Sequence, residues 1–261
     1  ARGELAPGQT VVELTSGNTG TGLAIVCAVK GHPFVAVMSR GNSPERARMM
    51  AAMGAEVVLV DQRPDSPPGR VSGADLDLVE AAAQRLARDR GAFRADQFAL
   101  KGNARAHLLH TGPEILRQAG GRIDVFCDFA GTGGSFAGCA AAFKRHNPAI
   151  RCYLIEPEGA AALAGRPVTR PGHRIQGGGY SRSRLAQIDP ELVDGYLSVT
   201  DTEAIETARR LAREEGVFAG VSSGANVAAA LGLLRTSARG KTIAVLLCDS
   251  GLKYLSTDLW L

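Results

Sequence analysis

Short apolar runs alternate with helical segments along almost the whole chain. The apolar runs fall at 11–14, 34–38, 56–60, 123–129, 150–155, 196–199 and 243–247. Segments with helical character separate them, for example at 19–29, 74–90, 104–118, 202–215 and 226–234. Continuous apolar runs are typical of strands covered on both faces, and alternation of strands with helices is typical of parallel sheets. The sequence therefore predicts an α/β fold with mostly parallel sheets flanked by helices.

The strand and helix segments form two series, which predicts two domains. A chain of 261 residues is long enough for two cores. The first series contains a stretch at 62–73 rich in Pro, Gly, Asp and Ser, which predicts a loop. We expect a smaller N-terminal domain at 1–100 and a larger one at 101–261.

Composition excludes several classes of protein. The net charge is +4 and the basic residues are dispersed, so no nucleic-acid partner is expected. The longest apolar run, 23–29, is far below the ~20 residues of a membrane span, so no membrane partner is expected either. The five cysteines are widely spaced, which indicates neither a zinc site nor a disulfide framework. They favour a reducing compartment, and we expect the cytoplasm.

Polar loops follow several of the predicted strands at the end where parallel sheets bind ligands. The first loop is Thr15-Ser16-Gly17-Asn18-Thr19-Gly20, at the start of a predicted helix. Free backbone amides and the helix dipole there would bind an anion. The alternative is an ordinary helix cap, in which these side chains only satisfy the amides. The residue types alone leave both interpretations open.

A glycine-rich loop, Ala130-Gly131-Thr132-Gly133-Gly134-Ser135, follows the apolar run at 123–129. Glycines let the backbone approach a ligand closely, and successive amides can surround a phosphate. A dinucleotide fingerprint would need a third glycine where Phe136 stands, so phosphate binding is favoured, with a structural turn as the alternative. Two further loops, Asp249-Ser250-Gly251 and Gln176-Gly177-Gly178-Gly179-Tyr180, carry a weaker signal.

These motifs together resemble the cysteine synthase family of fold-type II enzymes, which depend on pyridoxal 5′-phosphate (PLP). The resemblance also includes Thr111-Gly112-Pro113-Glu114-Ile115, His173-Arg174-Ile175-Gln176-Gly177 and Lys253-Tyr254-Leu255-Ser256-Thr257, so it spans nearly the whole chain. It implies two α/β domains like those of the tryptophan synthase β-subunit, with PLP between them.

The resemblance also implies roles for individual residues. Asn18 would hydrogen-bond the 3′-oxygen of PLP, and Ser250 would face the pyridine nitrogen. The PLP phosphate would be held by the glycine-rich loop, namely Gly131, Thr132, Gly133, Gly134 and Ser135. The substrate α-carboxylate would be bound by Thr15, Ser16, Gly17 and Thr19, with Gln97, and Gly178 would lie in a loop over the substrate.

The implied reaction is β-replacement on a small amino acid. An O-activated serine would lose its β-substituent to give an aminoacrylate, and sulfide or another nucleophile would then add. The alternatives are a β-eliminating lyase, a serine or threonine dehydratase, and an inactive homologue that only binds. The family implies a homodimer.

The chain departs from the family pattern at the Schiff-base lysine. Relatives carry it upstream of the Thr-Ser-Gly-Asn loop, which begins here at residue 15. The lysines of this chain are Lys30, Lys101, Lys144, Lys241 and Lys253, and none lies in the expected motif. We therefore assign no catalytic residue, and we expect that an N-terminal segment precedes Ala1 and that the chain alone is inactive. Residues 1–8 are expected to be the end of a helix and a turn.

Overall fold

The computed structural model describes residues 4–261, so the helix end expected around residues 1–3 lies outside the described residues. The chain divides into two compact units, 1–97 with 252–261, and 98–251. Each unit contains one parallel sheet, so the predicted α/β fold with two parallel sheets is confirmed. In the part of the chain that is described, no helix has both the length and the apolar character needed to cross a membrane.

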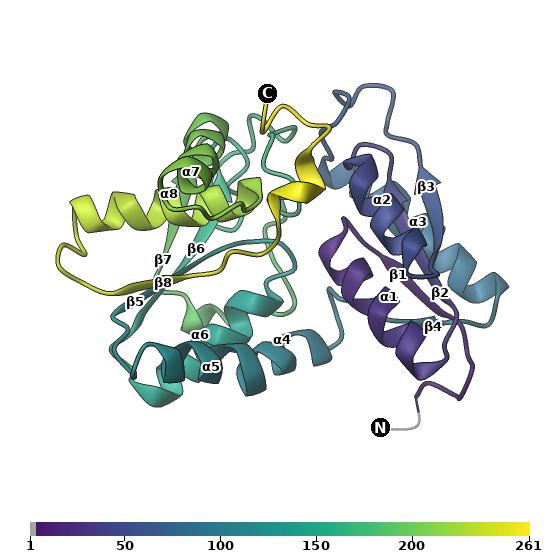
Figure 1. Cartoon of the computed structure of the whole chain (residues 1–261), viewed down its shortest axis with the longest axis horizontal. Coiled ribbons are helices and arrows are strands. Elements are labelled where there is room, and N and C mark those ends of the chain that lie inside the picture. The colour runs from purple at the N-terminus through teal and green to yellow at the C-terminus, as the bar shows by residue number, and fades with distance from the viewer. Residues whose placement is uncertain (1–3) are drawn as a thin grey trace. The chain divides into compact units, whose positions relative to one another are not determined.

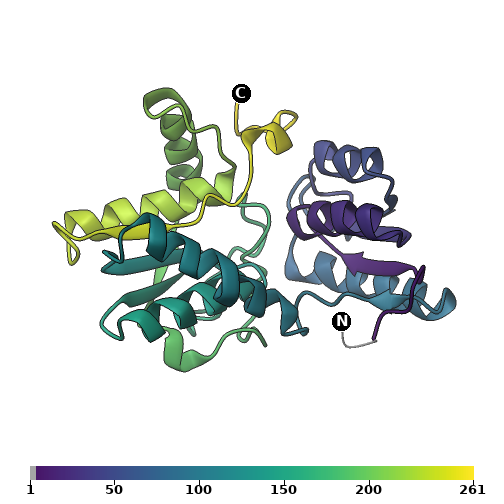
Figure 2. The same cartoon turned by 60° about the horizontal axis from the view of Figure 1, so that its bottom comes forward.

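The first unit is a four-stranded sheet covered on both faces. The strand order is β3-β2-β1-β4. Its elements are β1 (Val11–Leu14), α1 (Asn18–Lys30), β2 (Phe34–Ser39), α2 (Pro44–Ala52), β3 (Glu56–Val60), α3 (Gly73–Asp89) and β4 (Phe93–Arg94). Figure 2 shows α1 and α2 on one face of this sheet and α3 on the other. β1 and β2 are buried along their whole length, as their apolar sequences predict.

The second unit is also a four-stranded parallel sheet, in the order β7-β6-β5-β8. Figure 1 shows α7 and α8 on one face and α4, α5 and α6 on the other. Its elements are α4 (Gly102–Ala106), η1 (His107–Thr111), α5 (Gly112–Gln118), β5 (Val125–Phe129), α6 (Gly134–His146), β6 (Arg151–Pro157), η2 (Pro190–Leu192), β7 (Gly195–Val199), α7 (Asp201–Glu214), α8 (Val221–Arg235) and β8 (Ile243–Val245). Phe126 is the centre of the core, 5.9 Å from the Phe136 ring and 5.0 Å from the Phe143 ring.

The last ten residues lie with the first unit, although the sequence pattern predicted them in the second domain. They begin within η3 (Gly251–Tyr254). Tyr254 is buried under the Arg46 guanidinium, which lies 4.7 Å from the ring centroid, and Glu45 accepts hydrogen bonds from Ser256. These contacts with the first turn of α2 hold the C-terminal segment on the first unit.

Some elements differ from the sequence-based expectation. The single helix predicted over 104–118 is α4, a π-helical turn η1, and α5. Gly138 of α6 approaches this segment so closely that a Cβ there would lie 2.3 Å from the Ala104 carbonyl oxygen. β4 was not predicted, because its two residues are too few to form a recognisable apolar run; it pairs with Val11 and Val12. α8 begins at Val221 rather than near residue 226.

Candidate functional site

The loop after β1 is organised around the buried hydroxyl of Thr15. Its Oγ1 accepts hydrogen bonds from Gly17 N at 3.0 Å and Gly20 N at 2.9 Å. Gly17 has φ of +134°, and a Cβ there would lie 2.8 Å from Cδ of Arg46. Glycine is therefore required by both backbone conformation and space. The Thr15 hydroxyl thus holds the loop backbone from its buried side, whereas the neighbouring Asn18 and Thr19 are exposed.

Gln97 lies beside this loop, although it is 78 residues away from Thr19 in the chain. The pairing of β4 with β1 brings it there. Thr19 Oγ1 donates to Gln97 Oε1 at 2.6 Å, and Gln97 Nε2 donates to the Leu14 carbonyl oxygen at 2.7 Å. The structure thus brings Gln97 next to the loop that carries the other predicted substrate-binding residues of the first unit.

Lys253 contacts Asn18, a pairing that the sequence did not predict. Its Nζ donates to Asn18 Oδ1 at 2.5 Å, and its side chain is buried. An ammonium group has only donors, so the amide oxygen of Asn18 must face it and the amide NH₂ points elsewhere. Arg46, also buried, donates to the Ser16 carbonyl oxygen. A basic residue shortly after Asp249-Ser250-Gly251 was the only sequence signal for Lys253.

In the second unit, the glycine-rich loop joins β5 to α6 and ends at the start of that helix. Gly133 caps α6 in the left-handed conformation, with φ of +82°. At Gly134, a Cβ would lie 2.1 Å from Oδ1 of Asn103. Thr132 Oγ1 accepts from Asn103 Nδ2 at 2.9 Å and from Gly134 N at 3.3 Å. Both acceptor positions of this hydroxyl are used, so its proton is left to donate to a ligand.

Ser135 is the second residue of α6, and its hydroxyl faces a buried carboxyl. Ser135 Oγ lies 2.5 Å from Asp128 Oδ2, and Asn226 Nδ2 lies 3.4 Å from Asp128 Oδ1. Burial raises the pKa of Asp128 to about 6, although hydrogen bonds from Ser135, Asn226 and a backbone amide oppose the rise. Neither Asp128 nor Asn103 was predicted. An acidic residue inside the apolar run at 123–129 was the available signal for Asp128.

Gly178 lies directly against the glycine-rich loop. A Cβ at Gly178 would lie 2.5 Å from the Ala130 carbonyl oxygen, which accepts from Gly179 N at 2.8 Å. Ser250 is exposed in the same unit, where it forms an antiparallel bridge with Ala219. The predicted residues thus form three groups, namely the Thr15–Thr19 loop with Gln97, the glycine-rich loop with Gly178, and Ser250.

The five lysines do not supply an amine in the expected motif. Lys144 pairs with Asp194 at 2.6 Å and Lys241 pairs with Asp124 at 3.2 Å. Lys30 and Lys101 are exposed, the former in the last turn of α1 and the latter before α4. None of these lysines is therefore assigned as the Schiff-base lysine, which stays a prediction.

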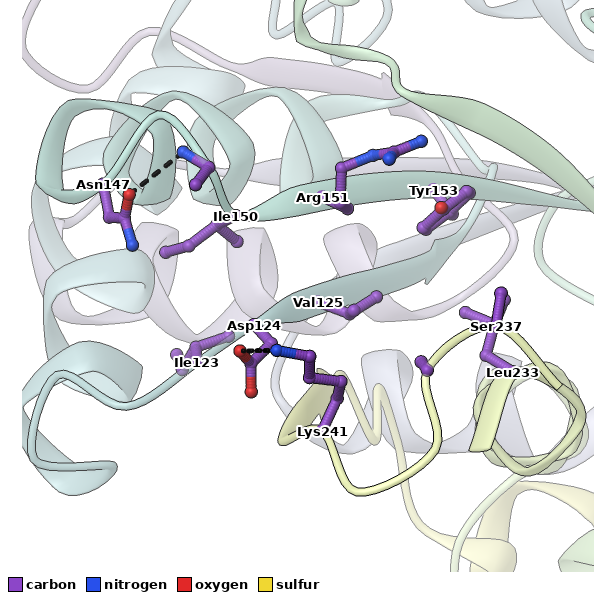
Figure 3. Close-up of a pocket in the computed structure, with 12 residues that line it drawn as sticks. Ile123, Asp124, Val125, Asn147, Ile150, Arg151, Tyr153, Leu233, Ser237 and Lys241 are labelled. Atoms are coloured by element: carbon purple, nitrogen blue, oxygen red, sulfur yellow. Dashed lines mark hydrogen bonds and ion pairs between the residues drawn. The ribbon is translucent and has the colours of Figure 1, made fainter. Parts of the chain in front are cut away.

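A separate cavity of about 380 Å³ in the second unit is not the candidate site (Figure 3). It is lined by Val125 and Arg151, the first residues of β5 and β6, and by Lys241 shortly before β8. Strands of a parallel sheet point the same way, so this cavity is at the amino ends and the motif loops are at the carboxyl ends. The polar groups drawn there, including the Asp124–Lys241 pair, therefore lie at the strand ends opposite to the motif loops.

Comparison with known proteins agrees with the motifs. Residues 1–249 match the family described as "Pyridoxal-phosphate dependent enzyme". The chain is 40% identical to the cysteine synthase of Staphylococcus aureus over 260 residues, which cover 99% of this chain and 79% of that protein. It is 39% identical to the O-ureido-L-serine synthase of Streptomyces lavendulae, covering 100% of this chain and 76% of that protein.

Solved structures give the same result. A crystal structure of O-ureido-L-serine synthase has a TM-score of 0.86 and 37% identity, covering 99% of this chain and 78% of that one. A hydrogen sulfide-producing enzyme from Fusobacterium nucleatum has a TM-score of 0.88 and 35% identity, covering 97% of this chain and 82% of that one. The resemblance read from the sequence is confirmed: the chain belongs to the family of pyridoxal-phosphate dependent enzymes, with the cysteine synthases among its relatives.

Proposed function

We propose that this protein uses PLP to replace the β-substituent of an O-activated serine with a nucleophile such as sulfide. The observation that carries the proposal is the glycine-rich loop, in which Gly134 lies directly against the Asn103 side chain. The Thr132 hydroxyl there accepts two hydrogen bonds, so its own proton is available for a ligand. The relatives named as cysteine synthase and O-ureido-L-serine synthase support this class of reaction.

The residues of this chain fit PLP in their chemistry. The amides and hydroxyls of Gly131–Ser135, at the start of α6, suit a phosphate dianion. The NH₂ of Asn18 would donate to the 3′-oxygen, because Lys253 occupies the amide oxygen. Ser250 would offer a neutral hydroxyl to the ring nitrogen. When bound, PLP supplies the electron sink for bond changes at the α and β carbons of an amino acid.

The Thr15–Thr19 loop would hold the amino-acid substrate. Ser16 and Thr19 present polar groups where α1 begins, and backbone amides at a helix start favour a carboxylate. Gln97 holds the Thr19 hydroxyl in place. The substrate is thereby oriented by its α-carboxylate, and its β-substituent is left free to depart.

A second candidate function is β-elimination with release of hydrogen sulfide. The neighbour from Fusobacterium nucleatum described as a hydrogen sulfide-producing enzyme has 35% identity and favours this candidate. Water rather than sulfide would then complete the turnover of the substrate. The candidate donor substrates are therefore O-acetylserine, O-phosphoserine, serine and cysteine.

The family likeness also supports a homodimer, and the five free cysteines support a reducing compartment such as the cytoplasm. We include both in the proposal. Sedimentation of the purified protein at micromolar concentration tests the dimer, and a single monomeric species would contradict it.

The test of function is formation of cysteine from O-acetyl-L-serine and sulfide by the purified protein with PLP. Methylamine is added in parallel, because an amine in solution can stand in for a Schiff-base lysine. Because none of the five lysines is assigned to the Schiff base, we expect sulfide-dependent turnover when methylamine is present. This turnover should be lost in Thr132→Ala and retained in the matched control Thr207→Ala on α7. Turnover of cysteine without added nucleophile would favour the second candidate. No turnover of any donor, with or without methylamine, would reject both.

A further inference from the structure

The carboxyl of Asp128 is unusual because it is an acidic group within a fully buried strand. Asp128 is the fourth residue of β5 and is 1% exposed. Among the described residues it forms no ion pair with Lys, Arg or His. Its side-chain hydrogen-bond partners are the Ser135 hydroxyl at 2.5 Å and the Asn226 amide at 3.4 Å. A buried carboxylate without a cation is costly, so burial raises the pKa of this carboxyl and shifts it toward the neutral acid.

The Ser135 hydroxyl has one proton, and its direction depends on Asp128. If Asp128 is ionised, it can only accept, so Ser135 must donate its proton inward to the carboxylate. If Asp128 is protonated, the acid donates to Ser135 Oγ across the same 2.5 Å, and the Ser135 proton is free for another acceptor. A phosphate dianion accepts hydrogen bonds, so it favours the second arrangement.

We propose that Asp128 is a positioning residue that sets the donor state of Ser135, and that phosphate binding at Gly131–Ser135 is coupled to uptake of one proton by Asp128. This rests on the proposed function, which places the phosphate of PLP at this loop. The dianion and the carboxylate repel each other, and the protonated pair supplies one more donor to the phosphate. Both effects act in the same direction.

The other titratable groups around Asp128 do not replace it in this role. They are the thiols of Cys127 on β5, Cys139 on α6, Cys152 on β6 and Cys248 after β8. Desolvation raises the pKa of all four thiols, to about 12 for Cys127 and Cys152, so they stay neutral. α8 contributes Asn226, whose amide also donates to the Leu246 carbonyl oxygen at 2.7 Å and does not titrate.

The sign of the pH dependence follows from the direction of the shift. Burial already raises the pKa of Asp128 to about 6 without ligand, and a bound dianion raises it further. If phosphate binding requires protonated Asp128, the affinity is highest at a pH below the Asp128 pKa of the free protein. It falls as pH rises toward the pKa of the complex, by up to about tenfold per pH unit.

The experiment is isothermal titration calorimetry with pyridoxine 5′-phosphate, which has the phosphate and no aldehyde, so it forms no Schiff base with lysine. Titrations in two buffers of different ionisation enthalpy give the number of protons taken up. Above pH 7 the ligand phosphate is already a dianion, because its second pKa is about 6. We expect uptake of nearly one proton per ligand at pH 7.5 and a falling affinity up to pH 8.5.

The matched variant is Asp128→Asn, whose amide donates to Ser135 at every pH. We expect it to bind the probe with no proton uptake and no fall in affinity above pH 7. As a measurement that needs no variant, infrared difference spectra of the natural protein should show a protonated carboxyl signal that appears when the probe binds. Equal proton uptake in the natural protein and in Asp128→Asn would overturn the inference, as would no new carboxyl signal.

Thr132→Ala separates this result from the proposed function. If it weakens probe binding at least tenfold while proton uptake is absent from the natural protein, the cofactor site stands and the role of Asp128 is wrong. If the probe binds equally well to Thr132→Ala, or does not bind at all, the glycine-rich loop is not the phosphate site, and both proposals fall.

Discussion

At the scale of single residues, Lys253 orients Asn18, the residue of the first unit that is expected to bind the cofactor. Its Nζ donates to Asn18 Oδ1 at 2.5 Å and fixes which end of the amide faces away. In Lys253→Met the Asn18 amide would rotate freely, and one charge-assisted hydrogen bond would be lost. We expect the dissociation constant of pyridoxine 5′-phosphate to rise roughly 3- to 10-fold, corresponding to about 1 kcal/mol.

A double-mutant cycle tests whether Lys253 acts through Asn18. Lys253→Met should have no further effect in an Asn18→Ala background, because the amide it orients is then absent. Lys241→Met is the matched control, since Lys241 is a half-exposed lysine paired with Asp124. An equal weakening by Lys253→Met with and without Asn18 would show that the lysine acts by another route.

Individual residue roles were only partly predictable from the sequence. The positions of the loops were predictable, because glycines and hydroxyls directly after apolar runs mark the ends of strands, whereas the binding roles of these loops stay predictions. Asn103, Asp128 and Lys253 were not assigned, because their roles come from partners between 7 and 235 positions away. Such pairs are tertiary contacts that form only when the chain folds, so a local sequence pattern does not indicate them.

At the scale of elements, the start of α1 depends on one glycine. Gly17 combines φ of +134° with an approach of 2.8 Å between a virtual Cβ and Arg46 Cδ. We expect Gly17→Ala to lower the free energy of unfolding by about 2–3 kcal/mol. Gly22 is the control within the same helix: a Cβ there would meet nothing within 4 Å, so Gly22→Ala should stabilise by about 0.5–1 kcal/mol. Urea unfolding midpoints measure both, and a similar small effect at both positions would contradict the strain.

The start of α3 is a capping box that fixes the end of the loop at 62–73. Asp75 accepts from Ser72 N at 2.9 Å, Ser66 Oγ at 2.8 Å and Arg63 N at 2.8 Å. Burial raises the pKa of Asp75, but these hydrogen bonds outweigh it and hold the pKa below its usual value. The carboxylate therefore stabilises the fold above the pKa of the unfolded chain, near ~3.9, and that stability is lost as pH falls through the folded pKa.

Asp75→Asn should therefore cost about 1–2 kcal/mol at pH 7, and less at an acid pH at which the Asp75 carboxyl is protonated in the folded protein. Urea unfolding at both pH values measures this difference. The matched control is Asp89→Asn, because Asp89 is exposed at the last turn of the same helix, where its charge opposes the helix dipole. A cost at Asp75 that stays constant with pH would mean that its charge has no part in the cap.

The elements themselves were largely predictable, since the apolar runs at 11–14, 34–38 and 56–60 became β1, β2 and β3 almost residue for residue. The misses have physical causes. β4 has two residues and is defined by its pairing with β1, and the π-helical turn η1 keeps the helical spacing of its neighbours, so periodicity does not separate it from them.

At the scale of the whole molecule, the sequence indicated two series of strands and helices, but not that the chain returns to the first unit at its end. Residues 252–261 are too few to show a pattern of their own. Their position follows from tertiary contacts: Ser43 Oγ donates to the Lys253 carbonyl oxygen, and Tyr254 and Leu259 are each 2% exposed. One short helix, η3, therefore joins Ser250 of the second unit to Lys253 of the first.

Removal of this segment should destabilise the first unit selectively. A chain ending at Gly251 loses two buried hydrophobic side chains, Tyr254 and Leu259, each contributing about 1.5–3 kcal/mol, and leaves Glu45 without Ser256. Amide hydrogen exchange should show lost protection in α1 and α2, while β5, β6 and α6 keep theirs. Glu45→Ala should give a weaker form of the same pattern, and Glu206→Ala on α7 should leave protection unchanged. If protection in the second unit falls as far as in the first, the segment supports the whole molecule, and the two units do not unfold separately.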